Sequence, residues 1–126
     1  MPRRIIATDQ APGAIGPYNQ AIESDGWIFT AGQIPLDPQT MEVVGETAPD
    51  QARQALRNAQ AVLQAASASL TDVVKVTVFV RDMGQFAAIN EVYREFFPED
   101  PPARSVVEVS GLPKDVQVEV EMIARR

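Results

Sequence analysis

The chain has 126 residues, a formal net charge of −6 at pH 7, and neither histidine nor cysteine. A chain of this length builds one hydrophobic core, so we expect a single domain over residues 1–126. The missing side chains exclude Ser-His-Asp and Cys-His nucleophiles, disulfides and thiolate zinc sites, and the acidic balance opposes binding to a nucleic-acid backbone.

The first part of the sequence predicts a β-hairpin and a loop. Strands are predicted over residues 18–24 and 27–34, because the Asp25-Gly26 dipeptide between them suits the positive φ angles of a tight turn. The proline-containing segment that follows is predicted to be a loop with one short extended piece over residues 41–44.

Two helices and a central strand are predicted for the middle of the chain. Thr47 is placed to cap the first helix through its hydroxyl group. The apolar stripe of this helix consists of Ala52, Leu56, Ala59, Leu63, Ala66 and Leu70.

The central strand lies within residues 72–82, where β-branched residues alternate with a period of two. Its shared apolar face consists of Val74, Val76, Val78 and Val80. The second helix runs from about Gly84 to Phe97, before a proline-rich segment. Its buried stripe consists of Phe86, Ile89, Tyr93 and Phe96.

The chain is predicted to end in two strands, RSVVEVS and VQVEVEMIA, around a GLPKD turn. Pairing them as a hairpin sets Arg104 opposite Glu121 and Val106 opposite Glu119, although a slip of one residue would turn every side chain to the other face. The order is then β-β-β-α-β-α-β-β. It predicts an α+β fold, in which two helices cover one face of a six-stranded mixed sheet.

No apolar run in the sequence approaches the ~18 residues that span a bilayer. The start, MPRRIIATDQ, lacks the apolar stretch of about 7 to 15 residues that a secretory signal contains. We therefore expect a cytoplasmic protein without a membrane partner.

Arg104 stands directly after a Pro-Pro-Ala corner, at the start of a predicted strand. One interpretation is a cross-strand salt bridge at the surface, which contributes under about 1 kcal/mol. The other is a carboxylate clamp, because the planar guanidinium group forms two parallel hydrogen bonds with a carboxylate. The residues alone leave both interpretations open.

Several other positions are candidates for a site. Tyr18 follows a glycine- and proline-containing loop and is either a core aromatic or the wall of a ligand site. Gly32 ends a predicted strand, where the missing side chain indicates either a β-bulge or the close approach of a ligand. Glu119 and Glu121 share one strand face, a spacing that suits an acid/base pair but also occurs in any strand with a polar face.

Five motifs occur in order along the chain: IGPYNQA, FTAGQIPLDP, NEVYREFF, PPARSVVEV and LPKDVQVEVEMIA. Together they resemble the RidA family, also called YjgF, over nearly the whole chain from about Ile5 to Arg126. The resemblance implies a chorismate-mutase-like fold and a homotrimer with its sites in clefts between subunits. Independently, the expected uncovered face of the sheet carries Phe79 and Ile123, which favours contact with another subunit.

The activity implied by the resemblance is that of a 2-iminobutanoate/2-iminopropanoate deaminase. Such enzymes hydrolyse the enamines 2-aminoacrylate and 2-aminobutenoate, or their imine tautomers, to 2-keto acids and ammonia. No cofactor and no metal is implied. The substrates are small imino and enamino acids that leave pyridoxal-phosphate-dependent dehydratases as unstable products, so a functional link to those enzymes is expected.

The resemblance also implies roles for individual residues. Arg104 matches the arginine that binds the substrate carboxylate, and Glu119 matches the residue that positions or activates the attacking water, with Tyr18 beside it. Backbone groups near Gly32 and Val106 are expected to orient the imine. Asn90, in the NEVY motif, matches a further position around the site.

Four features depart from the family pattern. Ala31 stands where many active members have serine, which removes one hydroxyl contact with the substrate. Val106 replaces a common cysteine, and Pro101 stands where an aromatic residue often precedes the arginine motif. The segment over residues 97–103 is also shorter than in typical members, so we expect a wider pocket.

Two other functions remain open. Endoribonuclease or translation-inhibitor activity is also ascribed to family members, although the acidic charge and the missing histidine oppose it. A non-enzymatic module that binds small carboxylates or proteins would retain Arg104 only as an anchor.

Overall fold

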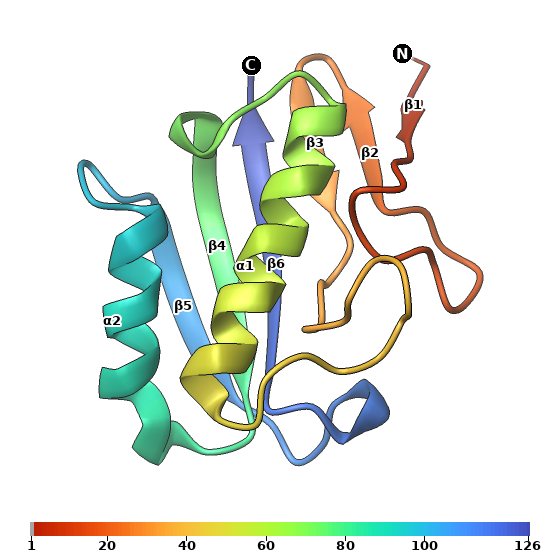
Figure 1. Ribbon diagram of the computed structural model, residues 1–126. Coiled ribbons are helices and arrows are strands. Elements are labelled where there is room, and N and C mark those ends of the chain that lie inside the picture. The colour runs from red at the N-terminus through yellow and green to blue at the C-terminus, as the bar shows by residue number, and fades with distance from the viewer. Residues whose placement is uncertain (1) are drawn as a thin grey trace.

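The computed structural model describes residues 2–126 and shows two helices in front of a six-stranded sheet (Figure 1). The strands are β1 Arg4–Ile6, β2 Ala21–Ser24, β3 Trp27–Thr30, β4 Val73–Val80, β5 Ala103–Glu108 and β6 Val118–Arg125. The helices are α1 Ala48–Ala65 and α2 Phe86–Phe96, with 3₁₀ turns at Leu70–Asp72, Met83–Gln85 and Pro113–Asp115. The strand order is β1-β2-β3-β6-β4-β5, and only the β4–β5 pair is parallel. The predicted α+β fold with a mixed sheet is therefore confirmed.

The hairpin between β2 and β3 turns at Asp25 and Gly26, whose φ angles are 53° and 81°. Ser24 pairs with Trp27 across this turn. Two consecutive positive φ angles match the right-handed twist of the flanking strands, so the hairpin forms where the sequence predicts it.

The predicted loop is confirmed, but its short extended piece over residues 41–44, which was counted as the third strand, is not a strand of the sheet. This part of the chain makes only an isolated bridge between Leu36 and Val43, and Met41 takes a positive φ of 62° that a strand does not allow. The remaining strand of the sheet is β1, which pairs with β2 at the sheet edge. The predicted number of strands is thus right, but one strand was assigned to the wrong segment.

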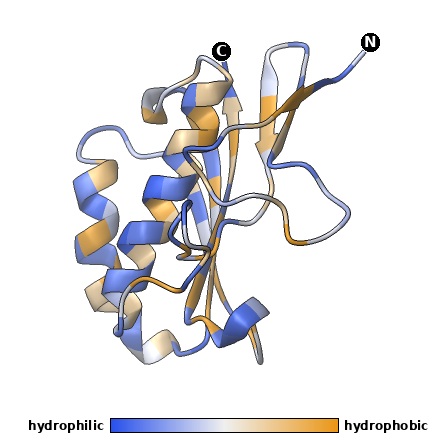
Figure 2. Cartoon of the chain, turned by 45° about the vertical axis from the view of Figure 1, so that its right-hand side comes forward, coloured by the Kyte–Doolittle hydropathy of each residue, from blue (hydrophilic) through white to orange (hydrophobic). Residues whose placement is uncertain are grey.

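The cap and the stripe predicted for α1 are confirmed as far as Ala66. The Thr47 side chain accepts a hydrogen bond from the Asp50 backbone N–H at 3.3 Å, and the stripe from Ala52 to Ala66 is buried. Figure 2 shows apolar and polar residues alternating along both helices, as amphipathic helices on a sheet require. Leu70 lies beyond the helix, because Ser67 takes a positive φ of 60° and ends it.

A bulge in β4 alters the face on which its valines lie. The register with β6 shifts between Val73 and Lys75, and Val74 turns outward with 43% of its surface exposed. The prediction that Val74 belongs to the buried face is therefore wrong. The three valines at alternate positions after it are buried as predicted.

The last two strands do not pair with each other, so the predicted terminal hairpin is wrong. β4 lies between them, with Arg104 of β5 beside Val76, and Val76 beside Met122 of β6. β4 carries four buried valines, and a central place in the sheet keeps them from water better than an edge does. The connection that contains Pro113–Asp115 leads the chain from β5 past β4 to β6. Because β4 separates the two strands, Arg104 does not face Glu121.

The face of the sheet away from the helices carries apolar side chains. Ile5, Phe29 and Val107 are exposed on this face, and Phe79 and Ile123 are half-buried on it. Apolar side chains that gather on one uncovered sheet face are typical of a protein–protein contact surface.

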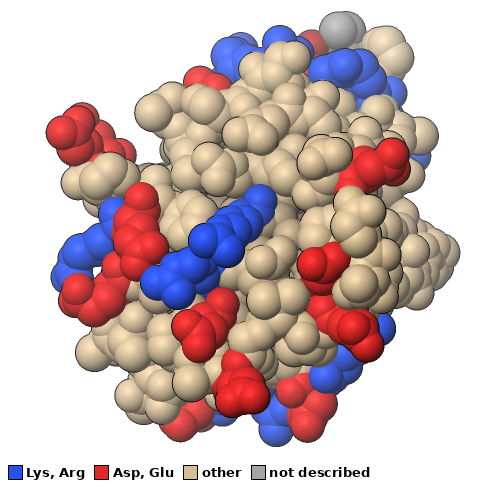
Figure 3. Space-filling view, viewed as in Figure 1, with Lys and Arg blue, Asp and Glu red and all other residues tan. Residues whose placement is uncertain are grey.

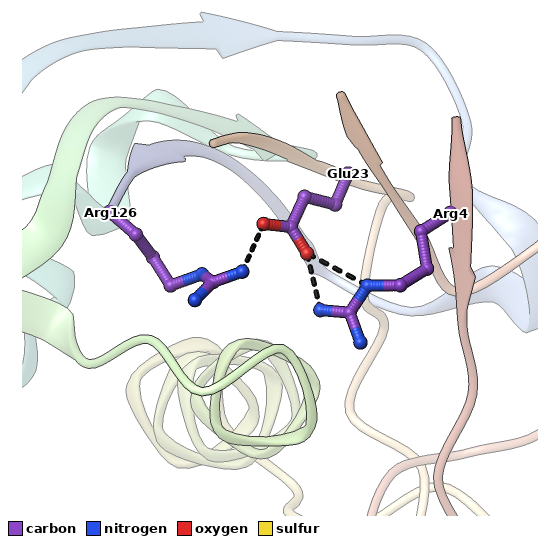
Figure 4. Close-up of polar contacts among 3 residues, drawn as sticks. All are labelled: Arg4, Glu23 and Arg126. Carbon is purple, nitrogen blue, oxygen red and sulfur yellow. Dashed lines mark hydrogen bonds and ion pairs between the residues drawn. The ribbon is translucent and has the colours of Figure 1, made fainter. Parts of the chain in front are cut away.

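Glu23 on β2 joins the first strand to the end of the chain. Arg4 of β1 and Arg126 both donate hydrogen bonds to its carboxylate (Figure 4). The hydrogen bonds from Arg4, which has the larger effect, and from Arg126 hold the pKa of the Glu23 carboxyl below its usual value. Burial of the carboxyl acts in the opposite direction and raises the pKa.

Candidate functional site

Arg104 lies on the side of β5 that faces α2. Its Nη1 atom donates a hydrogen bond to Asn90 Oδ1 at 2.8 Å, and its guanidinium carbon lies 4.6 Å from the ring centre of Tyr93 and 5.5 Å from that of Phe86. One amide and two aromatic rings thus hold the arginine. It forms no salt bridge with any residue from 2 to 126, so the interpretation as a cross-strand ion pair is wrong for the isolated chain.

A cavity of about 340 Å³ opens beside this arginine. It is lined by Asn90, Tyr93, Arg94, Phe97, Pro101, Pro102 and Arg104. The guanidinium group keeps most of its N–H donors free, because only the bond to Asn90 uses one of them. The cavity therefore combines apolar walls with a cation that can bind a carboxylate in bidentate geometry.

Val106 follows two residues later on the outermost strand of the sheet. The Val109 N–H donates to the Val80 carbonyl of β4 at 2.8 Å, and backbone groups alternate in direction along a strand. The N–H and C=O groups of Val106 accordingly point away from β4, beyond the sheet edge. These two backbone groups are available to a ligand beside Arg104, and their availability does not depend on which side chain stands at position 106.

Phe86 and Tyr93 are the neighbours of Arg104 that the sequence interpretation missed. Phe86 was assigned to the buried stripe of the second helix, but 39% of its surface is exposed, whereas Tyr93 is buried. The sequence contained a signal for these contacts, because residues three and four positions apart share one face of a helix. Asn90 lies four positions after Phe86 and three before Tyr93, so the three side chains are expected on one face.

Glu119 and Gly32 form a second group of candidate site residues, on the other face of the sheet. Glu119 lies beside Phe79 of β4, and its carboxylate is packed against the backbone of Gly32. A Cβ atom at Gly32 would lie 1.8 Å from Glu119 Oε2, so any side chain there would displace the carboxylate. The glycine is thus explained by the close approach of a carboxylate of the same chain.

The pairing of β3 and the following residues with β6 is irregular near Gly32. Phe29 pairs with Ile123, but Gln33 bridges to Val120, so β3 has one extra residue between these two pairs. Thr30 fills the resulting gap, since its hydroxyl accepts a hydrogen bond from the Met122 N–H at 3.0 Å. The alternative of a bulge near Gly32 therefore holds as well.

A hollow of about 280 Å³ surrounds the Glu119 carboxylate. It is lined by Ile15, Tyr18, Ala31, Gly32, Ile34, Pro113 and Glu119. Tyr18 is 44% exposed, and its hydroxyl accepts a hydrogen bond from the Ile15 N–H at 3.2 Å, so it is a wall of the hollow and not a core aromatic. Ala31 contributes a methyl group and no hydroxyl.

Burial in this hollow raises the pKa of the Glu119 carboxyl above its usual value, and the nearby charge of Glu121 raises it further. A carboxylate with a raised pKa is a stronger base than an exposed one, and it is protonated more readily as the pH falls. Glu119 is thus suited to hold and polarise a water molecule. Glu121 acts here as a charge neighbour.

The two groups of residues lie on opposite faces of the sheet. Arg104 belongs to the row of Val76 and Met122, which faces the helices, whereas Glu119 belongs to the row of Phe79, which faces away from them. Three residues along β4 correspond to about 10 Å and two strand spacings to about 10 Å, so the two α-carbons are about 14 Å apart within the sheet. One chain brings Arg104 to Asn90 and Glu119 to Gly32, but not Arg104 to Glu119.

Comparisons with known proteins agree with this architecture. A family model described as endoribonuclease L-PSP matches residues 8–126. A RutC family protein of Pyrococcus horikoshii is 55% identical over 122 residues, which are 97% of each chain. The 2-iminobutanoate/2-iminopropanoate deaminase of Escherichia coli is 50% identical over 126 residues, which are 98% of each chain. The crystal structure of Escherichia coli TdcF with bound serine has a TM-score of 0.93 and 49% identity, and the match covers 98% of each chain.

These matches define a small α+β protein whose fold, over nearly its full length, is that of proteins named as deaminases of reactive intermediates. The chain belongs to the RidA/YjgF family, which the endoribonuclease L-PSP model describes. The resemblance read from the sequence motifs is therefore confirmed. Neither helix within residues 2–126 is both long and apolar enough to cross a bilayer.

Proposed function

We propose that the protein hydrolyses 2-iminobutanoate and 2-iminopropanoate, and the enamines from which they form, to 2-keto acids and ammonia. The observation that supports this most is the pair of complementary half-sites. An arginine with free donors lines one cavity, and a carboxyl with a raised pKa lines the other. A relative that is 50% identical bears the name of this activity.

In the proposed reaction the Arg104 guanidinium binds the substrate carboxylate, and Asn90 fixes the guanidinium group. The outward backbone groups of Val106 orient the imine nitrogen. Glu119 and Tyr18 position a water molecule on the imino carbon, with Gly32 leaving room for the carboxylate. Arg104, Glu119 and Tyr18 are the proposed catalytic residues. Substrate-binding positions are proposed at Ala31, Gly32, Asn90, Arg104 and Val106.

The chemistry needs only proton transfers. Water loses a proton to the Glu119 carboxylate as its oxygen bonds to the imino carbon, and the C=N π electron pair moves to the nitrogen, which takes a proton from solvent to give a tetrahedral amino alcohol. The proton on Glu119 then passes to the nitrogen, the C–N bond breaks to release ammonia, and the hydroxyl group gives its proton to solvent as the C=O bond forms. Because an imine is already electrophilic, positioning the water and holding the substrate supply most of the required acceleration.

We propose that each site is shared between subunits of a homotrimer. Arg104 and Glu119 of one chain lie on opposite sheet faces, so a substrate of a few ångströms meets both only when two chains contribute. The uncovered apolar face supplies a surface on which subunits would associate. A cytoplasmic location and a supply of substrate by pyridoxal-phosphate-dependent dehydratases remain part of this proposal.

Ribonuclease activity, which the description of the family model names, is the second candidate. Acidic and basic side chains are interspersed on the helical face, without a continuous basic surface (Figure 3). Nonspecific binding of RNA requires such a surface, since it depends on the release of counterions by lysine and arginine. Incubation with labelled RNA at low salt tests this candidate, and cleavage by the wild type that Glu119→Gln abolishes would favour it.

The test of the deaminase proposal is the release of ammonia and keto acid from imines that a serine or threonine dehydratase generates in place. Arg104→Ala removes the guanidinium group and is expected to lower kcat/KM roughly 30- to 5,000-fold, the equivalent of about 2–5 kcal/mol for an unpaired carboxylate. Arg94→Ala, which removes an exposed arginine at the rim of the same cavity, is the control. No acceleration by folded wild-type protein would instead favour a module that binds carboxylates without turnover.

A further inference from the structure

Tyr93 carries a hydroxyl group that forms no hydrogen bond. The residue is 6% exposed, and within residues 2–126 no other fully buried side-chain polar atom lacks a partner. A buried hydroxyl without a partner opposes folding, because it gives up its bonds to water and gains none. Any contribution of Tyr93 at this position must therefore come from its ring.

The ring lies between the core and the arginine. One neighbour is Phe97, whose ring centre is 4.8 Å away at an interplanar angle of 34°. The other is Arg104, whose guanidinium carbon lies 4.6 Å from the ring centre, within the range of a cation–π interaction. The ring thus transmits the fixed packing of α2 to the arginine side chain.

Tyr93 remains uncharged under ordinary conditions. Burial raises the pKa of its hydroxyl to about 12, although the charge of Arg104 opposes this shift. The attraction between the two residues is consequently that of a cation and a neutral aromatic face, and it should persist unchanged over the pH range of an assay.

We propose that Tyr93 is a positioning residue for the carboxylate clamp, whose ring face holds the Arg104 guanidinium group in the orientation that a ligand carboxylate requires. Asn90 bonds one Nη atom, and the ring restrains the plane of the group. An arginine that is already oriented loses less rotamer freedom when it binds. The inference rests on the proposed function of Arg104 as the group that binds the substrate carboxylate.

Two measurements test the proposal: the affinity for the product 2-oxobutanoate by calorimetry, and kcat and KM in the dehydratase-coupled assay. Tyr93→Phe keeps the ring and removes only the unpaired hydroxyl, so affinity and KM should stay within about twofold of wild type and the melting temperature should not fall. Tyr93→Leu removes the ring face. It should weaken 2-oxobutanoate binding roughly 3- to 30-fold and raise KM by a similar factor, with kcat changed less than about threefold.

A graded series separates positioning from packing. Phenylalanine, 4-fluorophenylalanine and pentafluorophenylalanine at position 93 have nearly the same shape but a progressively weaker electrostatic face. If the ring orients Arg104, the dissociation constant should increase along this series while the melting temperature stays nearly constant. Val92→Ala, a truncation of a buried residue on the same helix, is the structural control and should leave the dissociation constant unchanged.

Two results would overturn the proposal. One is a flat affinity along the fluorinated series, which would mean that Tyr93 only fills space. The other is a loss of affinity in Tyr93→Phe as large as that in Tyr93→Leu, which would mean that the hydroxyl itself is used. Failure of the proposed function looks different, because wild-type protein and Arg104→Ala would then bind 2-oxobutanoate equally weakly and neither would release ammonia.

Discussion

Mixing two inactive variants should restore activity if each site takes Arg104 from one chain and Glu119 from another. The variants are Arg104→Ala, which lacks the clamp, and Glu119→Gln, which lacks the base. Alone, the first should lose roughly 30- to 5,000-fold and the second about 10²- to 10⁴-fold in kcat/KM. Both substitutions should keep the fold intact, because the two side chains are half-buried beside cavities and neither belongs to the hydrophobic core.

The size of the recovery follows from the geometry. Because the two groups are about 14 Å apart within the sheet plane and on opposite faces, a site inside one chain is excluded. In a randomly mixed closed oligomer, half of the clamps and half of the bases are wild type, so about a quarter of the shared sites contain both. Activity should therefore rise from near zero to about a quarter of the wild-type value per site.

The assay uses two differently tagged variants that are unfolded together in equal amounts and refolded, and the whole mixture is assayed without selection for mixed oligomers. Ammonia release from dehydratase-generated 2-iminobutanoate is measured before and after mixing. As a control, wild type is mixed with the double variant Arg104→Ala/Glu119→Gln. A shared site again leaves about a quarter of all sites intact, whereas a site within one chain leaves about half. Mixed oligomers, verified by mass spectrometry, that are no more active than their parents would refute the shared site.

Three further outcomes are expected. Glu121→Gln removes a charge that raises the pKa of Glu119, so the acid limb of kcat/KM, on which activity falls as Glu119 is protonated, should move to lower pH. An unchanged limb would show that another group titrates. Gly32→Ala places a Cβ atom 1.8 Å from the Glu119 carboxylate, so activity should fall at least tenfold with little change in melting temperature, and combining it with Glu119→Gln should add little. Glu23→Gln should lower the free energy of unfolding at pH 7 by about 1–2 kcal/mol. The pKa of Glu23 is lower in the folded state than in the unfolded state, so its carboxylate contributes to the free energy of unfolding above the unfolded pKa and loses this contribution as the pH falls through the lowered folded pKa. The difference in unfolding free energy between wild type and Glu23→Gln should therefore vanish in acid. Denaturant titration from pH 7 to pH 2 measures this, and the exposed Glu99→Gln, the control, should show no such convergence.

Local chemistry explains why much of the fold could be predicted. Asp25 and Gly26 tolerate positive φ angles without help from the rest of the chain, so the hairpin is predictable from two residues. The Thr47 cap and the alanine-rich stripe of α1 depend only on neighbours within a few positions. The alternation in β6 likewise reveals which of its side chains are buried.

Long-range pairing explains where prediction failed. Adjacent strands joined by a turn most often form a hairpin, but β4 lies between β5 and β6, because its buried valines gain most from a central place in the sheet. The bulge that exposes Val74 and the short pairing of β1 also depend on partner strands that sequence periodicity does not reveal. Phe86 was assigned to the core for a similar reason, since helical spacing identifies a shared face but not what covers it.

The sequence by itself determined the family and the α+β class, and it singled out Arg104, Glu119, Gly32 and Asn90 as candidate site residues, since motifs and side-chain types are local properties. Only the tertiary structure decided that these residues lie in two groups on opposite faces of the sheet. The reason is physical: the face on which a strand residue lies depends on its register with a partner strand, and a shift of one residue reverses it.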